Sequence, residues 1–98
     1  MFIFGCVTKD PCRNLLFDKL TQYSTGGYDA FGIAINGIDS FDCAKGAKSV
    51  NELREILPQS ESNCGFIHAR WATCGERCDE NAHPFVGSQI CTASNGTI

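Results

Sequence analysis

The stretch Ala30-Phe-Gly-Ile-Ala-Ile-Asn-Gly37 decides the fold that this sequence predicts. Its apolar run from Phe31 to Ile35 is typical of a strand, and a second run extends from Ile38 to Cys43. Asn36-Gly37 stands between the two runs, and Asn-Gly in that position is the strongest short-range signal for a β-hairpin. The centre of the chain therefore predicts two neighbouring antiparallel strands.

Two amphipathic segments on either side of this hairpin predict helices. Asp10-Pro11 is typical of an N-cap followed by the first helical residue, and Ser24 to Gly27 ends that helix. Its buried face is expected to carry Cys12, Leu16, Leu20 and Tyr23. Ser49-Val-Asn-Glu52 is a capping box for the second helix, which Pro58 follows. The residues expected on the apolar face of that helix are Val50, Leu53, Ile56 and Leu57.

Three further apolar runs predict strands. They are Phe2 to Thr8, which we expect to be a buried strand, Gly65 to Ala69, and Gln89 to Ala93. Between the last two, Trp71 to Ser88 is predicted to be irregular. Strands packed beside helices, without a repeat or a linker, indicate one α/β (α+β) unit over residues 1–98.

Composition excludes several classes of protein. The chain has 98 residues, which is enough for one small domain. Its net charge of −3 excludes the broad basic surface of a nucleic-acid-binding protein, and no run approaches the roughly 20 apolar residues of a membrane span. Seven cysteines, an odd number without a CxxC pair, favour reduced thiols. We therefore expect a cytoplasmic protein without a nucleic-acid or membrane partner.

Polar chemistry is concentrated in His68-Ala-Arg-Trp-Ala-Thr-Cys-Gly75, at the end of a predicted strand. The planar guanidinium of Arg70 suits a carboxylate, and the Thr73 hydroxyl can add a hydrogen bond. The alternative is a structural arginine that pairs with a nearby acid, such as Asp29 or Glu76. In that case a half-buried Trp71 anchors the loop.

Two other patterns also have alternative interpretations. Asn95-Gly96 can donate an amide and a backbone N–H to an oxyanion, or can form a plain turn. Cys74, Cys78 and His83, with His68 as a fourth ligand, have the chemistry of a zinc site. Their spacing lacks the paired knuckles of structural zinc sites, so we expect no metal.

Four blocks of the sequence resemble the glutamine amidotransferases of the N-terminal-nucleophile class, and among them the glutamine–fructose-6-phosphate aminotransferases. The blocks are Phe2–Gly5, Gly26–Ala34, His68–Gly75 with Glu80–Pro84, and Ser94–Ile98. The resemblance implies a four-layer αββα fold with only its N-terminal part present. It also implies glutamine as substrate, fructose 6-phosphate as acceptor, no cofactor and a homo-oligomer. A C-terminal sugar-phosphate isomerase domain, present in the family, is missing from these residues.

The resemblance also implies roles for single residues. Arg70 would bind the α-carboxylate of glutamine, while Trp71 and Thr73 would shape the pocket. Asn95 and Gly96 would form the oxyanion hole. Where the family has arginine and histidine, this chain has Gly26 and Cys74.

Met1 stands at the position of the cysteine nucleophile of the family. A thioether has no ionisable proton and cannot attack an amide, so we expect no glutaminase activity from these 98 residues. Cys6 would become N-terminal only after cleavage behind Gly5, and we interpret it as a buried strand residue. The alternative function is a non-catalytic glutamine-binding or interaction module.

Overall fold

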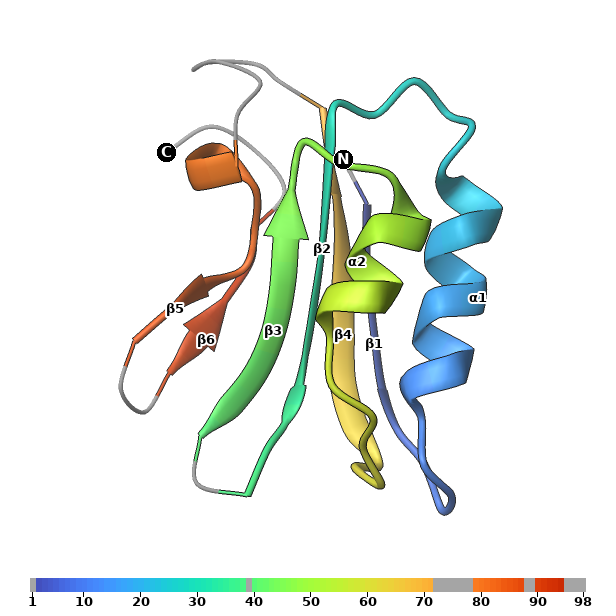
Figure 1. Cartoon of the computed structure of the whole chain (residues 1–98), viewed down its shortest axis with the longest axis vertical. Coiled ribbons are helices and arrows are strands. Elements are labelled where there is room, and N and C mark those ends of the chain that lie inside the picture. The colour runs from blue at the N-terminus through green and yellow to red at the C-terminus, as the bar shows by residue number, and fades with distance from the viewer. Residues whose placement is uncertain (1, 39, 72–78, 88–89, 95–98) are drawn as a thin grey trace.

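The computed structural model describes residues 2–38, 40–71, 79–87 and 90–94, and their centre is a four-stranded sheet (Figure 1). The strands lie in the order β1 (Phe2–Val7), β4 (Cys64–Arg70), β2 (Ala30–Asn36) and β3 (Phe41–Gly46). Every neighbouring pair in this sheet is antiparallel. Together with its helices, this sheet makes the chain an α+β protein, as the sequence predicts.

The hairpin predicted at Asn36-Gly37 is confirmed, but its second strand starts later than expected. Asn36 still belongs to β2 and pairs with Phe41, so the connection covers residues 37–40. The Gly37 N–H donates to the Ser40 carbonyl oxygen across this connection, at 2.7 Å. The prediction that the strand begins at Ile38 is wrong, because Ile38 lies in the connection with its side chain fully exposed.

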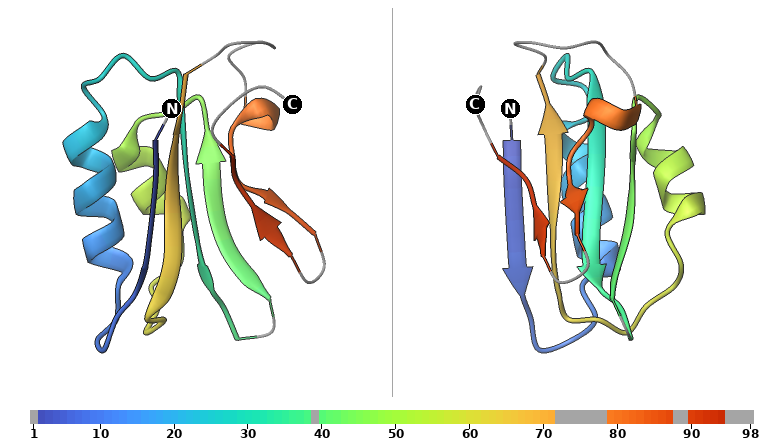
Figure 2. Two further views of the ribbon diagram at one scale, coloured as in Figure 1. Left: turned by 180° about the vertical axis from the view of Figure 1, so that it is seen from behind. Right: turned by 90° about the vertical axis from the view of Figure 1, so that its left-hand side faces the viewer.

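The two α-helices of the described residues cover the same face of the sheet (Figure 2). α1 (Arg13–Tyr23) and α2 (Val50–Ile56) pack there against the odd-numbered residues of β2 and β4, because successive side chains of a strand point to opposite faces. Neither helix has the length and apolar character needed to cross a membrane. The buried apolar core consists mainly of Phe31, Ile33, Ile35, Ile67 and Ala69 from the strands, and of Leu16, Phe17, Leu20, Val50 and Leu53 from the helices.

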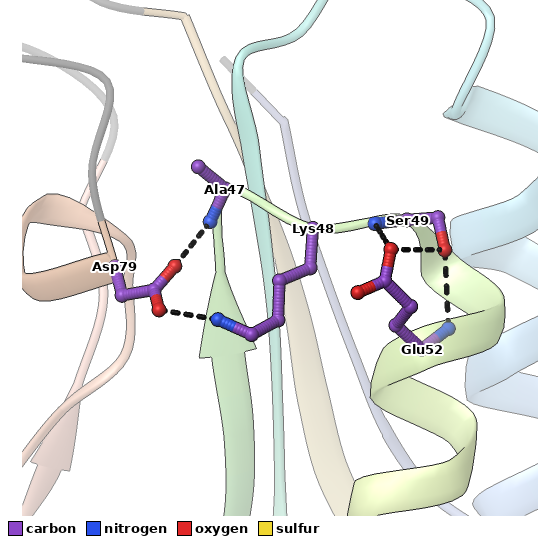
Figure 3. Close-up of polar contacts among 5 residues, drawn as sticks. All are labelled: Ala47, Lys48, Ser49, Glu52 and Asp79. Atoms are coloured by element: carbon purple, nitrogen blue, oxygen red, sulfur yellow. Dashed lines mark hydrogen bonds and ion pairs between the residues drawn. The ribbon is translucent and has the colours of Figure 1, made fainter.

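α2 begins with the capping box that the sequence predicts (Figure 3). The hydroxyl of Ser49 accepts the Glu52 N–H at 3.2 Å, and the Glu52 carboxylate accepts the Ser49 N–H at 3.3 Å. Ile56 is exposed, contrary to expectation, because the buried face of this short helix follows Val50, Leu53 and Leu57.

α1 begins two residues later than the sequence predicts. Its N-cap is Cys12, without a side-chain cap, so the assignment of Asp10 as N-cap and Pro11 as first helical residue is wrong. The Cys12 N–H instead donates to the Ser62 carbonyl oxygen at 2.9 Å, which ties the chain before the helix to the loop that enters β4. At the other end Tyr23 is partly exposed, and its ring stacks on Phe2 at 3.9 Å.

A buried arginine joins the two helices. Arg13, only 5% exposed, directs its guanidinium at the C-terminal end of α2. Nη2 donates to the carbonyl oxygens of Arg54 and Leu57, at 2.7 and 2.9 Å, and Nε donates to that of Pro58 at 3.1 Å. Carbonyl groups at a helix C-terminus have no partner within the helix, so Arg13 satisfies groups that would otherwise be buried without one.

The opposite face of the sheet carries the C-terminal segment. The short helix η1 (Asp79–Asn81) and the hairpin of β5 (Phe85–Val86) and β6 (Cys91–Thr92) lie there, in front of the sheet in the right-hand view of Figure 2. The sequence predicts an irregular segment where β5 lies and a longer strand where β6 lies. The first prediction is wrong, because a two-residue strand is too short to show an alternating pattern. The second is correct in that a strand lies within the predicted range, but this strand covers only Cys91–Thr92.

The expectation that the first strand is buried is correct for only one of its faces. β1 lies at the edge of the sheet, and its side chains alternate between partly buried and exposed. Phe2, Phe4 and Cys6 pack against the core beneath the helices, whereas Val7 is 79% exposed on the other face. β5 and β6 form a separate two-stranded sheet on the open face, and the complete four-layer arrangement remains a prediction.

Candidate functional site

The candidate site lies on the face of the sheet that the helices leave open. His68 and Arg70 on β4 and Gly32 on β2 are even-numbered, so they face away from the helical core. Gly32 and His68 are directly opposite each other in the β2–β4 register. The segment that contains η1, β5 and β6 lies against this face, where His83 approaches Gly32 and where His83 and Ser94 contact His68.

Gly32 allows this segment to approach the sheet closely. A Cβ atom at Gly32 would lie 1.5 Å from the His83 carbonyl oxygen and 2.6 Å from its carbonyl carbon. Both atoms belong to the backbone, which cannot rotate away as a flexible side chain can. Two blocks that are far apart in the sequence, Gly26–Ala34 and Glu80–Pro84, therefore meet through a glycine.

An aspartate holds the start of the same segment to the sheet. The Asp79 carboxylate accepts the Ala47 N–H at 2.9 Å and forms an ion pair with Lys48 (Figure 3). The Lys48 ammonium, followed by the Ala47 N–H, lowers the pKa of Asp79. The contact places η1 beside the turn between β3 and α2. The covering segment is therefore anchored at Asp79, the first residue of η1.

Two histidines meet beneath the segment. The rings of His68 and His83 stack with their centroids 4.1 Å apart and their planes within 9°. His68 is fully buried, and its Nε2 donates to the Ser94 carbonyl oxygen at 3.1 Å. The Ser94 N–H donates to His83 Nδ1, also at 3.1 Å. The two rings thus bind both backbone groups of the residue that directly precedes Asn95.

The hydrogen bonds fix the protonation state of His83. Nδ1 accepts a hydrogen bond from the Ser94 N–H and therefore carries no proton itself, so the ring is neutral. Burial lowers the pKa of His83, and the positive charges of Arg70 and Lys45 lower it further. Its environment and its hydrogen bond consequently favour the same neutral form.

Arg70 forms a buried ion pair. Its Nη1 lies 2.7 Å from Asp29 Oδ2, and the two side chains are only 6% and 16% exposed. The Asp29 N–H also donates to the Arg70 carbonyl oxygen, at 2.8 Å. This is the pairing that the sequence associates with a structural arginine. A guanidinium carries five donors, so the pairing is chemically compatible with a carboxylate ligand, and that role remains a prediction.

Aromatic rings border Arg70. Trp71 is 53% exposed, as a half-buried loop anchor should be, and its indole makes an edge contact with Tyr28 at 6.1 Å between centroids. Tyr28 in turn contacts Phe31 edge-on. Arg70, Asp29, Tyr28 and Trp71 therefore form one cluster at the end of β4.

Several predicted site residues lie outside the described part of the chain. They are Met1, Thr73, Cys74, Cys78, Asn95 and Gly96. Their roles remain predictions, as does the expectation of no zinc. Within the described ranges, no group of three or more His, Cys, Asp or Glu side chains is placed to hold a metal ion.

Sequence reasoning missed the contact between His68 and His83, which it considered only as zinc ligands, and it missed the backbone of Ser94. One signal was present, since His68 and Arg70 are two residues apart on a strand and must share a face.

Comparison with known proteins finds relatives that share this segment. No protein-family model matches the chain. The glutamine–fructose-6-phosphate aminotransferases of Caldanaerobacter subterraneus and Mycolicibacterium smegmatis are each 34% identical to it, over 100 and 107 residues. That of Buchnera aphidicola is 31% identical over 101 residues. Each match covers 98% of this chain but only 16–17% of the relative. Over the segment that it shares with them, the chain is similar to the glutamine–fructose-6-phosphate aminotransferases, and it spans about a sixth of their length.

Proposed function

We propose that this chain is part of a glutaminase domain, in which ammonia released from glutamine is transferred to fructose 6-phosphate by the whole protein. The names of the relatives support an enzyme of amino-sugar synthesis over a non-catalytic module. The observation that carries the proposal is the meeting of Gly32, His68 and His83, from three separate blocks, on one face of the sheet. Side-chain contacts among distant motifs are what a shared site requires.

Within this proposal Arg70 receives the α-carboxylate of glutamine. Arginine binds a carboxylate through two parallel hydrogen bonds, and Asp29 holds the guanidinium at the end of β4. Trp71 and Thr73 shape the pocket. Asn95 and Gly96 donate to the oxyanion that forms when the amide is attacked.

The remaining parts of the family arrangement also belong to the proposal. Residues 1–98 form part of an amidotransferase domain, and a larger second sheet with its own layer of helices covers the open face of the first sheet to complete four layers. A sugar-phosphate isomerase domain, assembly into a homo-oligomer and a cytoplasmic location are further parts of the proposal, and they rest on the same resemblance.

Glutamine binding by the 98-residue chain tests the carboxylate role. Isothermal titration with L-glutamine should detect binding, whereas L-glutamine methyl ester, which lacks the free carboxylate, should not bind. Arg70→Lys keeps the charge but loses the planar fork, so it should weaken glutamine binding by about tenfold or more.

Arg54→Lys is the matched control, because it makes the same change on α2, remote from the cluster at the end of β4. It should leave glutamine binding unchanged. Failure of the parent chain to bind L-glutamine contradicts the proposal, as does equal binding of the ester or of Arg70→Lys. Unfolding curves of both variants establish that each is folded at the titration temperature.

The second expected result is that the chain releases no ammonia from glutamine, because Met1 supplies no thiolate. A coupled ammonia assay measures this against a blank without protein. Ammonia release that a thiol-alkylating reagent abolishes would contradict the expectation and would indicate a cysteine nucleophile, with Cys6→Ser as the first variant to examine.

A further inference from the structure

Ser94 is held in an unusual way for a residue next to a strand end. Its N–H and its carbonyl oxygen both bond to side chains, and the two side chains are stacked on each other. His68 comes from a central strand of the sheet and is fully buried, so it provides a fixed point. His83 is fixed by its stacking on His68 and by the close approach of its backbone to Gly32.

We propose that His68 and His83 are positioning residues that together clamp Ser94 through its carbonyl oxygen and its N–H, and thereby fix the direction in which the chain leaves β6. Ser94 directly precedes Asn95-Gly96 in the sequence. The clamp therefore sets the starting point of the two residues to which the proposed function assigns the oxyanion hole. This link to glutamine rests on the proposed function, whereas the clamp itself does not.

The clamp requires a neutral His83. A proton added at Nδ1 would replace the acceptor with a second N–H directed at the Ser94 N–H, and the hydrogen bond would be lost. Acidification should therefore release Ser94 from His83.

The groups around His83 oppose its protonation. Lys45 on β3 and Arg70 on β4 both lower its pKa below the ordinary value of 6.5, and burial lowers it most. Arg70 is paired with Asp29, which offsets part of its charge. Cys91 on β6 interacts electrostatically with Lys45. Burial raises the pKa of the Cys91 thiol, so Cys91 adds no negative charge at neutral pH. On its other side His83 meets the apolar ring of Phe85.

The direction of the pH effect follows from this shift. The unfolded chain takes up a proton on His83 near pH 6.5, before the folded chain does, so protonation favours unfolding as the pH falls below that value. The loss is complete once the pH passes below the pKa of the folded state. Above pH 6.5 both states are neutral and the clamp is fully formed.

Amide hydrogen exchange in the 98-residue chain tests the clamp without any ligand. The protection factor of the Ser94 amide should be high at neutral pH and should fall about tenfold, the ratio expected for one lost hydrogen bond, with a midpoint below pH 6.5. The Gly87 amide, which donates to Ile90 in the turn of the β5–β6 hairpin, is the internal reference and should stay protected.

Two pairs of variants separate a clamp from simple packing. His83→Asn keeps an acceptor near the position of Nδ1 but does not titrate, so Ser94 protection should persist without a midpoint. His83→Phe keeps a ring but has no acceptor, and protection should be lost at every pH. At the other histidine, His68→Gln keeps a donor near the position of Nε2 and should retain the clamp, whereas His68→Phe should not.

The outcomes are distinct. Ser94 protection that survives His83→Phe, or a midpoint that persists in His83→Asn, overturns the clamp. If L-glutamine binding weakens with the same midpoint in the parent chain but not in His83→Asn, the clamp acts on the glutamine pocket. If the Ser94 amide responds as expected and glutamine binds without any pH midpoint, the link to the pocket is wrong. If the Ser94 amide responds and glutamine does not bind at all, the proposed function fails and the clamp stands.

Discussion

Gly32→Ala is expected to displace the whole segment from η1 to β6 and to lower the free energy of unfolding by about 3 kcal/mol, the upper end for an overpacked site. The added Cβ would lie 1.5 Å from the carbonyl oxygen of His83, so either that backbone or β2 must move. Since β2 is a central strand, paired on both sides, the segment is the part that moves. Urea unfolding measures the change in the free energy of unfolding. Loss of hydrogen-exchange protection at the Ser94 amide reports the displacement of the segment.

Gly5→Ala is the control for this change. Gly5 lies on β1, on the same face of the sheet, and its Cβ would meet Phe66 Cβ at 3.5 Å, an ordinary van der Waals distance. This variant should be within about 1 kcal/mol of the parent chain, because alanine also restricts the unfolded state. If Gly32→Ala and Gly5→Ala lower the free energy of unfolding equally, the site does not depend on the close approach of His83 to Gly32.

Arg13→Met is expected to cost about 3 kcal/mol or more in chemical unfolding. The guanidinium supplies three hydrogen bonds to the C-terminal carbonyl groups of α2, and methionine fills a similar volume without supplying any. Hydrogen bonds to a charged group contribute about 1.5–3 kcal/mol each, and buried acceptors left without partners add a desolvation cost. The loss should appear as a lower urea midpoint with an unchanged dependence on urea concentration.

Arg54→Met tests whether the charge or the capping matters. Arg54 lies over the same Phe17 ring as Arg13, and its side chain is partly exposed, with a distant ion pair to Asp18. Such surface contacts contribute at most about 1 kcal/mol. A loss from Arg54→Met as large as that from Arg13→Met would contradict the capping role.

Sequence patterns predicted the elements whose stabilising contacts join residues close together in the chain. The capping box of α2 involves only Ser49 and Glu52, and the β2–β3 hairpin joins strands that follow each other, so both could be predicted from short stretches. The start of α1 could not, because it depends on the Ser62 carbonyl oxygen, fifty residues away in the chain from Cys12. A tertiary hydrogen bond outweighed the preference of Asp10 for an N-cap position.

The candidate site also has one part that the sequence predicts and one part that it does not. The grouping of Arg70 and Trp71 at a strand end is visible in the sequence, and so is Asp29 as a candidate partner. The stacking of His83 on His68 depends on the path of the chain after residue 78 and on the absence of a side chain at Gly32. Both are properties of packing between distant segments, which no periodic pattern encodes.

The place of β1 in the sheet has a consequence for the order in which this chain assembles during synthesis. β1 pairs only with β4, with Phe2 opposite Ala69 and Val7 opposite Cys64. A ribosome adds roughly 5–20 residues per second, so several seconds separate the translation of β1 from that of its partner. The β2–β3 hairpin, which can close within microseconds once made, forms in that interval. β1 is therefore expected to join the sheet after β2 and β3 have paired.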